Sequence, residues 1–103
     1  MHFLESKVAL KFTFDYNISD ISILCNLKNL TNLSLWGNEI EDISTLSQLT
    51  NLNKLSIDNN NINDISPLYG LTNITEIDIT GNQISEDQIA KLKEILPNCW
   101  FYP

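Results

Sequence analysis

The amino-acid sequence predicts an α/β repeat array in which short strands alternate with short helical return segments. Apolar residues recur at a spacing of 22: Leu30, Leu33, Leu35, Ile40 and Ile43 are followed by Leu52, Leu55, Ile57, Ile62 and Ile65, and then by Ile74, Ile77, Ile79 and Ile84. Within each unit the apolar period changes from two to three, which is typical of a strand followed by a tight helical segment. Because such units bury their apolar sides against each other, at least about three are needed.

The spacing also predicts the domain organisation. We expect residues 1–8 to be an N-terminal cap or a truncated repeat and residues 9–103 to form one repeat domain. The predicted units are 9–29, 30–51, 52–73, 74–95 and the half unit 96–103. In the first unit Phe12 and Phe14 precede Leu33 and Leu35 by 21 residues, whereas Ile18 precedes Ile40 by 22. This unit is therefore predicted to lack one residue after its strand.

The helical segments are predicted from spacing and capping residues. Spacing by three, as in Ile40, Ile43, Leu46 and Leu49, suits 3-10 or short helical segments. Ser66 followed by Pro67 indicates an N-cap and a first helical residue. In the fourth unit Ser85 and Gln88 form a capping-box pattern, which predicts an α-helix that ends before Pro97.

A final edge strand is predicted near residues 98–103. The 22-residue spacing places Leu96, Cys99 and Phe101 beside Ile74, Ile77 and Ile79.

The segments LTNLSLWGNEIEDISTL and LNKLSIDNNNINDISPL resemble leucine-rich repeats of the 22-residue subclass. This subclass is seen in bacterial internalins and in regulatory subunits of protein phosphatase 1. The resemblance implies a right-handed solenoid with a parallel concave β-sheet, a convex side of 3-10 or short helical segments, and one α-helix in the last repeat. It also implies that ligands bind on the concave face.

The charge balance argues against two classes of partner. Thirteen acidic and six basic residues give a formal charge of −7, and a phosphate backbone or an anionic membrane needs clustered Lys and Arg. The N-terminus carries no signal-peptide pattern, and no apolar stretch is long enough to span a membrane. We expect a cytoplasmic protein if the chain is complete, and a secreted or surface protein if it is a fragment of a longer exported one.

The sequence offers little for catalysis. His2 is the only histidine, and Cys25 and Cys99 fall in the first and last units, too far apart for a disulfide. Carboxylates such as Asp58 and Asp78, on an open surface, lack the burial that tunes a pKa for acid–base chemistry. We predict that the protein is not an enzyme and uses no metal and no cofactor.

Two polar columns are predicted to be structural. Asn17, Asn38, Asn60 and Asn82 would form a stacked ladder that satisfies backbone groups where the chain turns off each strand. Asp20, Asp42 and Asp64, continued by Glu86, would cap the convex segments. Calcium is the competing interpretation of the second column, but one carboxylate per unit, about 5 Å from the next, does not supply a converging ligand set.

The outward side of the strands remains for function. The 22-residue spacing predicts three columns there: Lys11, Asn32, Lys54, Glu76 and Asn98; Thr13, Ser34, Ser56, Asp78 and Trp100; and Asp15, Trp36, Asp58, Thr80 and Tyr102. From these we select Asp15, Trp36, Asp58, Glu76, Asp78, Trp100 and Tyr102 as partner-binding candidates, because exposed aromatic residues are frequent hot spots and an acidic rim favours a basic partner. Alternatively, Trp36 lies flat over neighbouring strands, and Trp100 and Tyr102 only shield the last strand.

We predict a non-catalytic protein–protein interaction module, acting as a monomer, that binds a protein through its concave strand face. One alternative is a regulatory subunit that docks on an enzyme such as a phosphatase. Another is a fragment of a secreted or surface internalin-like adhesin, and a third is a structural spacer without a ligand.

Overall fold

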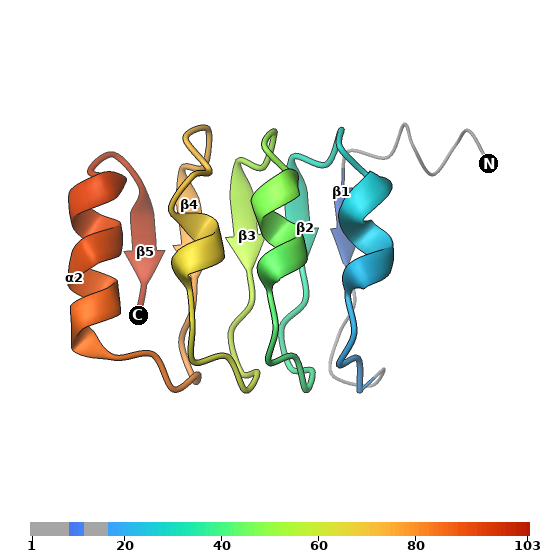
Figure 1. Ribbon diagram of the computed structural model, residues 1–103, viewed down its shortest axis with the longest axis horizontal. Coiled ribbons are helices and arrows are strands. Elements are labelled where there is room, and N and C mark those ends of the chain that lie inside the picture. The colour runs from blue at the N-terminus through green and yellow to red at the C-terminus, as the bar shows by residue number, and fades with distance from the viewer. Residues whose placement is uncertain (1–8, 12–16) are drawn as a thin grey trace.

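A computed structural model describes residues 9–11 and 17–103 (Figure 1). The elements, with η denoting a 3-10 helix, are β1 (Ala9–Lys11), η2 (Ser22–Asn26), β2 (Asn32–Ser34), η3 (Ser44–Gln48), β3 (Lys54–Ser56), η4 (Ser66–Leu68), β4 (Glu76–Asp78), α2 (Glu86–Ile95) and β5 (Trp100–Tyr102). The predicted alternation of strands with helical segments, and the single α-helix near the C-terminus, are confirmed within this part of the chain.

The five strands form one parallel sheet in the order β1-β2-β3-β4-β5. Figure 1 shows the strands side by side, with the helical segments in a second layer and α2 next to β5. Each unit therefore adds one strand and one return segment to the stack, and the molecule measures 40 × 27 × 18 Å. This is the architecture of a solenoid, in which a unit contacts mainly its neighbours.

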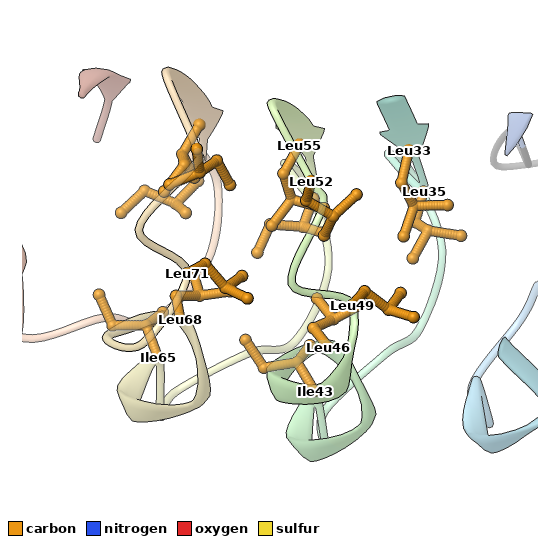
Figure 2. Packing of buried hydrophobic residues seen from close by; sticks show 14 of the residues in the cluster. Leu33, Leu35, Ile43, Leu46, Leu49, Leu52, Leu55, Ile65, Leu68 and Leu71 are labelled. Carbon is orange, nitrogen blue, oxygen red and sulfur yellow. The ribbon is translucent and has the colours of Figure 1, made fainter. Parts of the chain in front are cut away.

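The core lies between the two layers (Figure 2). Leu33, Leu35 and Leu55 reach inward from the strand side, and Leu46 and Leu68 meet them from the helical side. All five are buried, and they belong to one continuous apolar cluster that runs from the first helical segment to Leu96. The change of apolar period from two to three places both sets of side chains toward this cluster.

Left-handed backbone conformations recur after the strands. Gly37, Asn59 and Gly81 lie 22 residues apart and have φ angles of 72°, 56° and 75°. Glycine and asparagine are the residues that adopt this conformation most readily. A Cβ atom added at Gly81 would also collide with the side chain of Asn59. The turn directs the following asparagine, as in Asn38 and Asn60, into the interior.

The buried asparagines link each unit to the next. Asn60 Oδ1 accepts from Ile40 N–H at 3.0 Å, and Asn60 Nδ2 donates to Leu35 and Ile57 C=O, both at 3.0 Å. Equivalent bonds are made by Asn38 and Asn82. Asn17, by contrast, is exposed and itself has a φ of 49°, so it does not lie in the buried ladder where the sequence prediction placed it.

The register of β1 differs from the prediction. Leu10 pairs with Leu33, at a spacing of 23, whereas the sequence predicted Phe12, which lies outside the described residues, beside Leu33. Ile18 keeps its spacing of 22 to Ile40, and the N–H groups of both donate to asparagine side chains. The first unit thus has one residue more after its strand, not one fewer. The error arises because a shift of two residues leaves every side chain on the same face.

The register of β5 is also shifted by two residues. Trp100 pairs with Glu76 and Tyr102 with Asp78, at a spacing of 24, so Asn98 does not occupy the position beside Glu76 that the 22-residue spacing gave it. The helix of the last unit is the cause. It has ten residues where η3 has five, and an α-helix rises only about 1.5 Å per residue against about 2.0 Å for a 3-10 helix. The segment that connects β4 to β5 therefore contains two more residues than the segments that connect β2 to β3 and β3 to β4.

Aspartates precede the 3-10 helices and bind their first N–H groups. The carboxylates of Asp20, Asp42 and Asp64 accept from the backbone N–H two residues later, at 2.8 to 2.9 Å. Ser66 was predicted to be an N-cap, but it is the first residue of η4. At this site the acceptor is Asp64 instead. These bonds, first from the backbone N–H and then from the serine side chain, lower the pKa of each carboxyl from 3.8.

These carboxylates should make the fold acid-sensitive. A carboxyl group whose pKa is lower in the folded than in the unfolded state stabilises the fold. This stabilisation is complete above the unfolded-state pKa and is lost as the pH falls through the folded-state pKa. Replacing Asp20, Asp42 and Asp64 together with asparagine keeps the acceptor oxygens but removes the titration. We expect the triple variant to lose less unfolding free energy than the wild type between about pH 6 and about pH 3, measured by urea unfolding.

The matched control for this prediction replaces three exposed glutamates, Glu39, Glu41 and Glu94, with glutamine. It removes the same charge without touching the three N–H acceptors. An aspartate variant that is as acid-sensitive as this control would contradict the proposed source of the pH dependence.

Gln88 adds a further link between the last unit and the residues just before η4. Ser85 Oγ accepts from Gln88 N–H at 3.3 Å, which is the first half of the predicted capping box. The Gln88 side chain does not complete the box. It accepts from Ile65 N–H at 2.8 Å and donates to Asn63 C=O at 2.7 Å. Gln88 thus bonds to the preceding unit, whereas each aspartate bonds to the 3-10 helix of its own unit.

Candidate protein-binding face

The sheet face that points away from the helical segments is here called the concave face. It carries a hollow of about 630 Å³. The hollow is lined by Ala9, Leu10, Asn32, Leu33, Ser34, Lys54, Leu55, Ser56, Glu76, Asp78 and Tyr102. All five strands contribute to this lining, and β5 contributes Tyr102.

The observed register fixes which outward side chains are neighbours. In the register, one row of positions consists of Ala9, Asn32, Lys54, Glu76 and Trp100, and the other of Lys11, Ser34, Ser56, Asp78 and Tyr102. Neighbouring strands in a sheet lie about 4.8 Å apart, so adjacent members of a row are within side-chain reach of one another. Four of the predicted partner-binding residues, Glu76, Asp78, Trp100 and Tyr102, are therefore brought together at one end of the concave face.

The two aromatic residues of this group are open to solvent. Trp100 is 66% exposed and Tyr102 is 43% exposed. Their ring centroids lie 6.4 Å apart with an interplanar angle of 62°, which is the edge-to-face geometry that aromatic pairs favour. Between them, Phe101 points to the other side, where Lys93 Nζ lies 5.9 Å from its ring centroid. The outward and inward sides of β5 are thus chemically distinct.

The remaining candidates lie elsewhere. Trp36 is half-buried and does not line the hollow, which differs from the exposed position that the sequence predicted. Asp58 lies beyond the end of β3, where its Oδ1 accepts from Ser56 Oγ at 2.6 Å. Asp15 lies outside the described residues, and so do Phe12, Thr13 and Phe14. The structure therefore groups the acids with Trp100 and Tyr102, not with Trp36.

Among the described residues, three charged side chains line the hollow. Lys54 and Glu76 are adjacent across β3 and β4, and Asp78 follows on the same strand as Glu76. One carboxylate oxygen of Asp78 accepts from Thr80 N–H at 3.0 Å, which orients the carboxylate at the end of β4. The positive charge is thus at the middle of the face, and the negative charges lie toward β5.

A second asparagine column was not predicted from the sequence. Asn51 Nδ2 donates to Lys28 C=O at 2.7 Å, and Asn73 Nδ2 donates to Thr50 C=O at 3.0 Å. Both asparagines lie in the turns that lead into the strands. Their spacing of 22 residues was the available signal. Because these asparagines bond to backbone carbonyls of the preceding unit, this column is structural.

Side chains that commonly bind metals are not clustered in the part of the chain that the structure describes. Among the described residues there is no group of three or more His, Cys, Asp or Glu side chains that could hold a metal ion. Cys25 and Cys99 are free thiols, as predicted. Burial raises the pKa of Cys99, with a smaller contribution from Glu76, so this thiol stays protonated and weakly nucleophilic.

The chain is similar in sequence and structure to known leucine-rich-repeat proteins. A family model described as leucine-rich repeats in two copies matches residues 50–95. The solved structure of internalin C2 from Listeria monocytogenes is 39% identical, with a TM-score of 0.83, over 95% of this chain and 42% of that one. An internalin of the same organism, InlF, is 34% identical, with a TM-score of 0.84, over 95% of this chain and 28% of that one.

A leucine-rich-repeat protein of Leptospira interrogans is similar at 26% identity and a TM-score of 0.70, over 81% of this chain and 22% of that one. No curated protein sequence matches the chain. The chain is a leucine-rich repeat protein. Its repeats are of the internalin type, and it spans less than half the length of the two internalins that it matches. None of the helices in residues 9–11 and 17–103 has the length and apolarity to cross a membrane.

Proposed function

We propose that this protein is a non-catalytic interaction module that binds another protein on its concave face. The leucine-rich-repeat fold is consistent with such a role, and the concave face supplies a hollow of suitable chemistry. The module needs no second copy of itself to complete this face, so we propose that it binds as a monomer.

One observation carries the proposal. At inward positions the units repeat the same chemistry, as in Leu33, Leu55 and Ile77, because those side chains fill one core. At the neighbouring outward positions the chemistry changes from unit to unit, as the row Ser34, Ser56, Asp78 and Tyr102 and the row Asn32, Lys54, Glu76 and Trp100 show. Stacking of the units does not require these changes. They are the variation expected of a surface that recognises a particular partner.

The charges favour a basic partner. The chain carries seven more acidic than basic residues, and Glu76 and Asp78 place part of that charge within the hollow. Complementary charge steers association and excludes acidic competitors.

Affinity capture from native extract tests the concave face directly. We expect a partner that is retained by the wild type to be lost from a Ser56→Arg variant, because the new side chain fills the centre of the hollow and adds positive charge. Ser47→Arg is the matched control, since Ser47 is exposed on η3 in the opposite layer. Retention by Ser47→Arg but not by Ser56→Arg supports the proposal. Equal retention by both, with both variants folded by circular dichroism, would contradict it.

A second candidate is that this module belongs to an exported internalin-like protein. The observation that favours it over a phosphatase-regulating role is the 39% and 34% identity to two internalins. An antibody raised against the folded module should then detect it at the surface or in the medium of native cells. Detection only in the cytosolic fraction would favour the regulatory alternative.

A further inference from the structure

We propose that Trp100, Tyr102, Glu76 and Asp78 form a subsite for an arginine side chain on an extended basic segment of the partner. This inference rests on the proposed function and names the chemistry of one part of it. It depends on the register of β5, which sets Trp100 beside Glu76 and Tyr102 beside Asp78.

The aromatic residues are the first part of the argument. A Trp side chain that is 66% exposed at the end of a sheet leaves a large apolar surface in water, and Tyr102 adds a second ring that is 43% exposed. Because the rings meet edge to face, at 62°, they do not cover one another as a parallel stack would. A ring face is electron-rich and attracts a cation placed over it. The pair therefore offers a platform for a cationic group.

The carboxylates are the second part. Glu76 and Asp78 line the hollow together with Tyr102, one strand away from the rings. A cation that lies on the aromatic platform would thus have a carboxylate beside it on β4. Asp78 keeps one oxygen on Thr80 N–H, which holds its carboxylate in place without neutralising it. Acids alone would attract any cation, whereas acids beside exposed rings select the kind of cation.

Arginine satisfies both halves of the subsite better than lysine. Its guanidinium is planar, stacks on aromatic faces and makes paired N–H bonds to a carboxylate. The ammonium of lysine is compact and strongly hydrated, so it loses more by leaving water for a ring face. The subsite should therefore discriminate between two side chains of equal charge.

The rest of the hollow indicates how the segment lies. Beyond the subsite the lining is small and polar at Ser34, Ser56 and Asn32, which can bond to an extended backbone. Lys54 lies beside Glu76 on the side away from Trp100. It would repel a second basic residue there, so the arginine is positioned at the β4–β5 end of the face.

A peptide titration tests the subsite without knowledge of the partner. The probe is a blocked decapeptide of Gly and Ser with three arginines, compared with the same peptide carrying lysine or neutral citrulline. The readout is the NMR signal of the indole N–H of Trp100, which is distinguished from that of Trp36, the other of the two tryptophans, by a Trp36→Phe variant. We expect a saturable shift of the Trp100 signal with the arginine peptide, about 5-fold weaker binding of the lysine peptide, and none of the citrulline peptide.

Variants separate the subsite from general charge attraction. Trp100→Ala, and separately Glu76→Gln with Asp78→Asn, should weaken the arginine peptide about 10-fold. The matched control, Glu39→Gln with Glu41→Gln, makes the same charge change at exposed residues outside the hollow and should change affinity by less than about twofold. Lys54→Gln should strengthen binding by about twofold, because it removes the positive charge beside Glu76.

Three results would overturn the inference: equal affinity for the arginine and lysine peptides, equal weakening by the control pair, or no saturable Trp100 shift up to about 5 mM peptide. The proposed function is tested separately by the Ser56→Arg capture. If capture depends on Ser56 but the subsite variants change neither capture nor the titration, the concave face stands and the arginine subsite falls. If the peptide binds at Trp100 while capture ignores Ser56, the subsite stands and the wider proposal falls.

Discussion

Replacing Asn60 with alanine is expected to lower the free energy of unfolding by about 2 to 3 kcal/mol. The side chain is buried and bonds to Ile40 N–H and to the carbonyl groups of Leu35 and Ile57. Its removal leaves Ile40 N–H without its partner inside the core, and an unsatisfied buried group costs about 1 to 3 kcal/mol. The two carbonyl groups each lose one of two amide donors, because Asn38 Nδ2 also donates to Leu35 C=O and Asn82 Nδ2 to Ile57 C=O. Because a domain of this size is stable by only about 5 to 15 kcal/mol, the loss is a large fraction of the total.

Urea unfolding followed by circular dichroism measures this loss. The matched control is Asn61→Ala, at the next residue, which is exposed; its effect should be below about 0.5 kcal/mol. A loss below about 1 kcal/mol for Asn60→Ala would show that the buried amide contributes little beyond filling space.

Leu46→Ala is expected to lower the unfolding free energy by about 3 kcal/mol. Leu46 is fully buried in η3 at the middle of the array, where it packs between the strand leucines and the helical segments on either side (Figure 2). Truncation removes apolar burial and leaves a cavity that neighbouring units cannot close without shifting.

Thermal unfolding of this variant gives a second test of the fold. The adjacent exposed residue supplies the control Ser47→Ala, which should leave the midpoint within a few degrees of the wild type. A Leu46→Ala variant as stable as this control would mean that the central units are not packed as Figure 2 shows.

The core was predictable because burial and periodicity carry the same information. Leu33, Leu35, Leu55 and Ile57 are inward in the sequence pattern and buried in the structure. Register was less predictable, since apolar alternation is unchanged by a shift of two residues. Leu10 could therefore replace Phe12 beside Leu33, and Phe101 could pair with Ile77 in place of Cys99. Only the length of the return segments decides between such registers.

The candidate site was predicted in its composition but not in its arrangement. Glu76, Asp78 and Tyr102 were assigned to the outward face and do line its hollow. Their exact neighbours depend on the shifted register of β5, so the pairing of Trp100 with Glu76 was not foreseen. Trp36 was selected as an exposed aromatic residue, yet it is half-buried and does not line the hollow. An outward position in the strand pattern does not by itself give exposure.

Gln88 illustrates a different limit. Its position three residues after Ser85 fits a capping box, and the local half of that box forms. The side chain instead bonds to Ile65 N–H and Asn63 C=O in the preceding unit. Local sequence rules describe bonds within one element, and the contact between consecutive units competes with them. The competition is visible only once the units are stacked.

Oxidative side-chain footprinting of the module with its captured partner tests most directly which face binds. Hydroxyl radicals modify aromatic and aliphatic side chains in proportion to their exposure. Binding on the concave face should protect Trp100 and Tyr102 and leave unchanged the modification of Tyr69 and of Ile23, which is 81% exposed on η2 in the other layer. Protection of Ile23 or Tyr69, with Trp100 and Tyr102 modified as in the free protein, would contradict binding on the concave face.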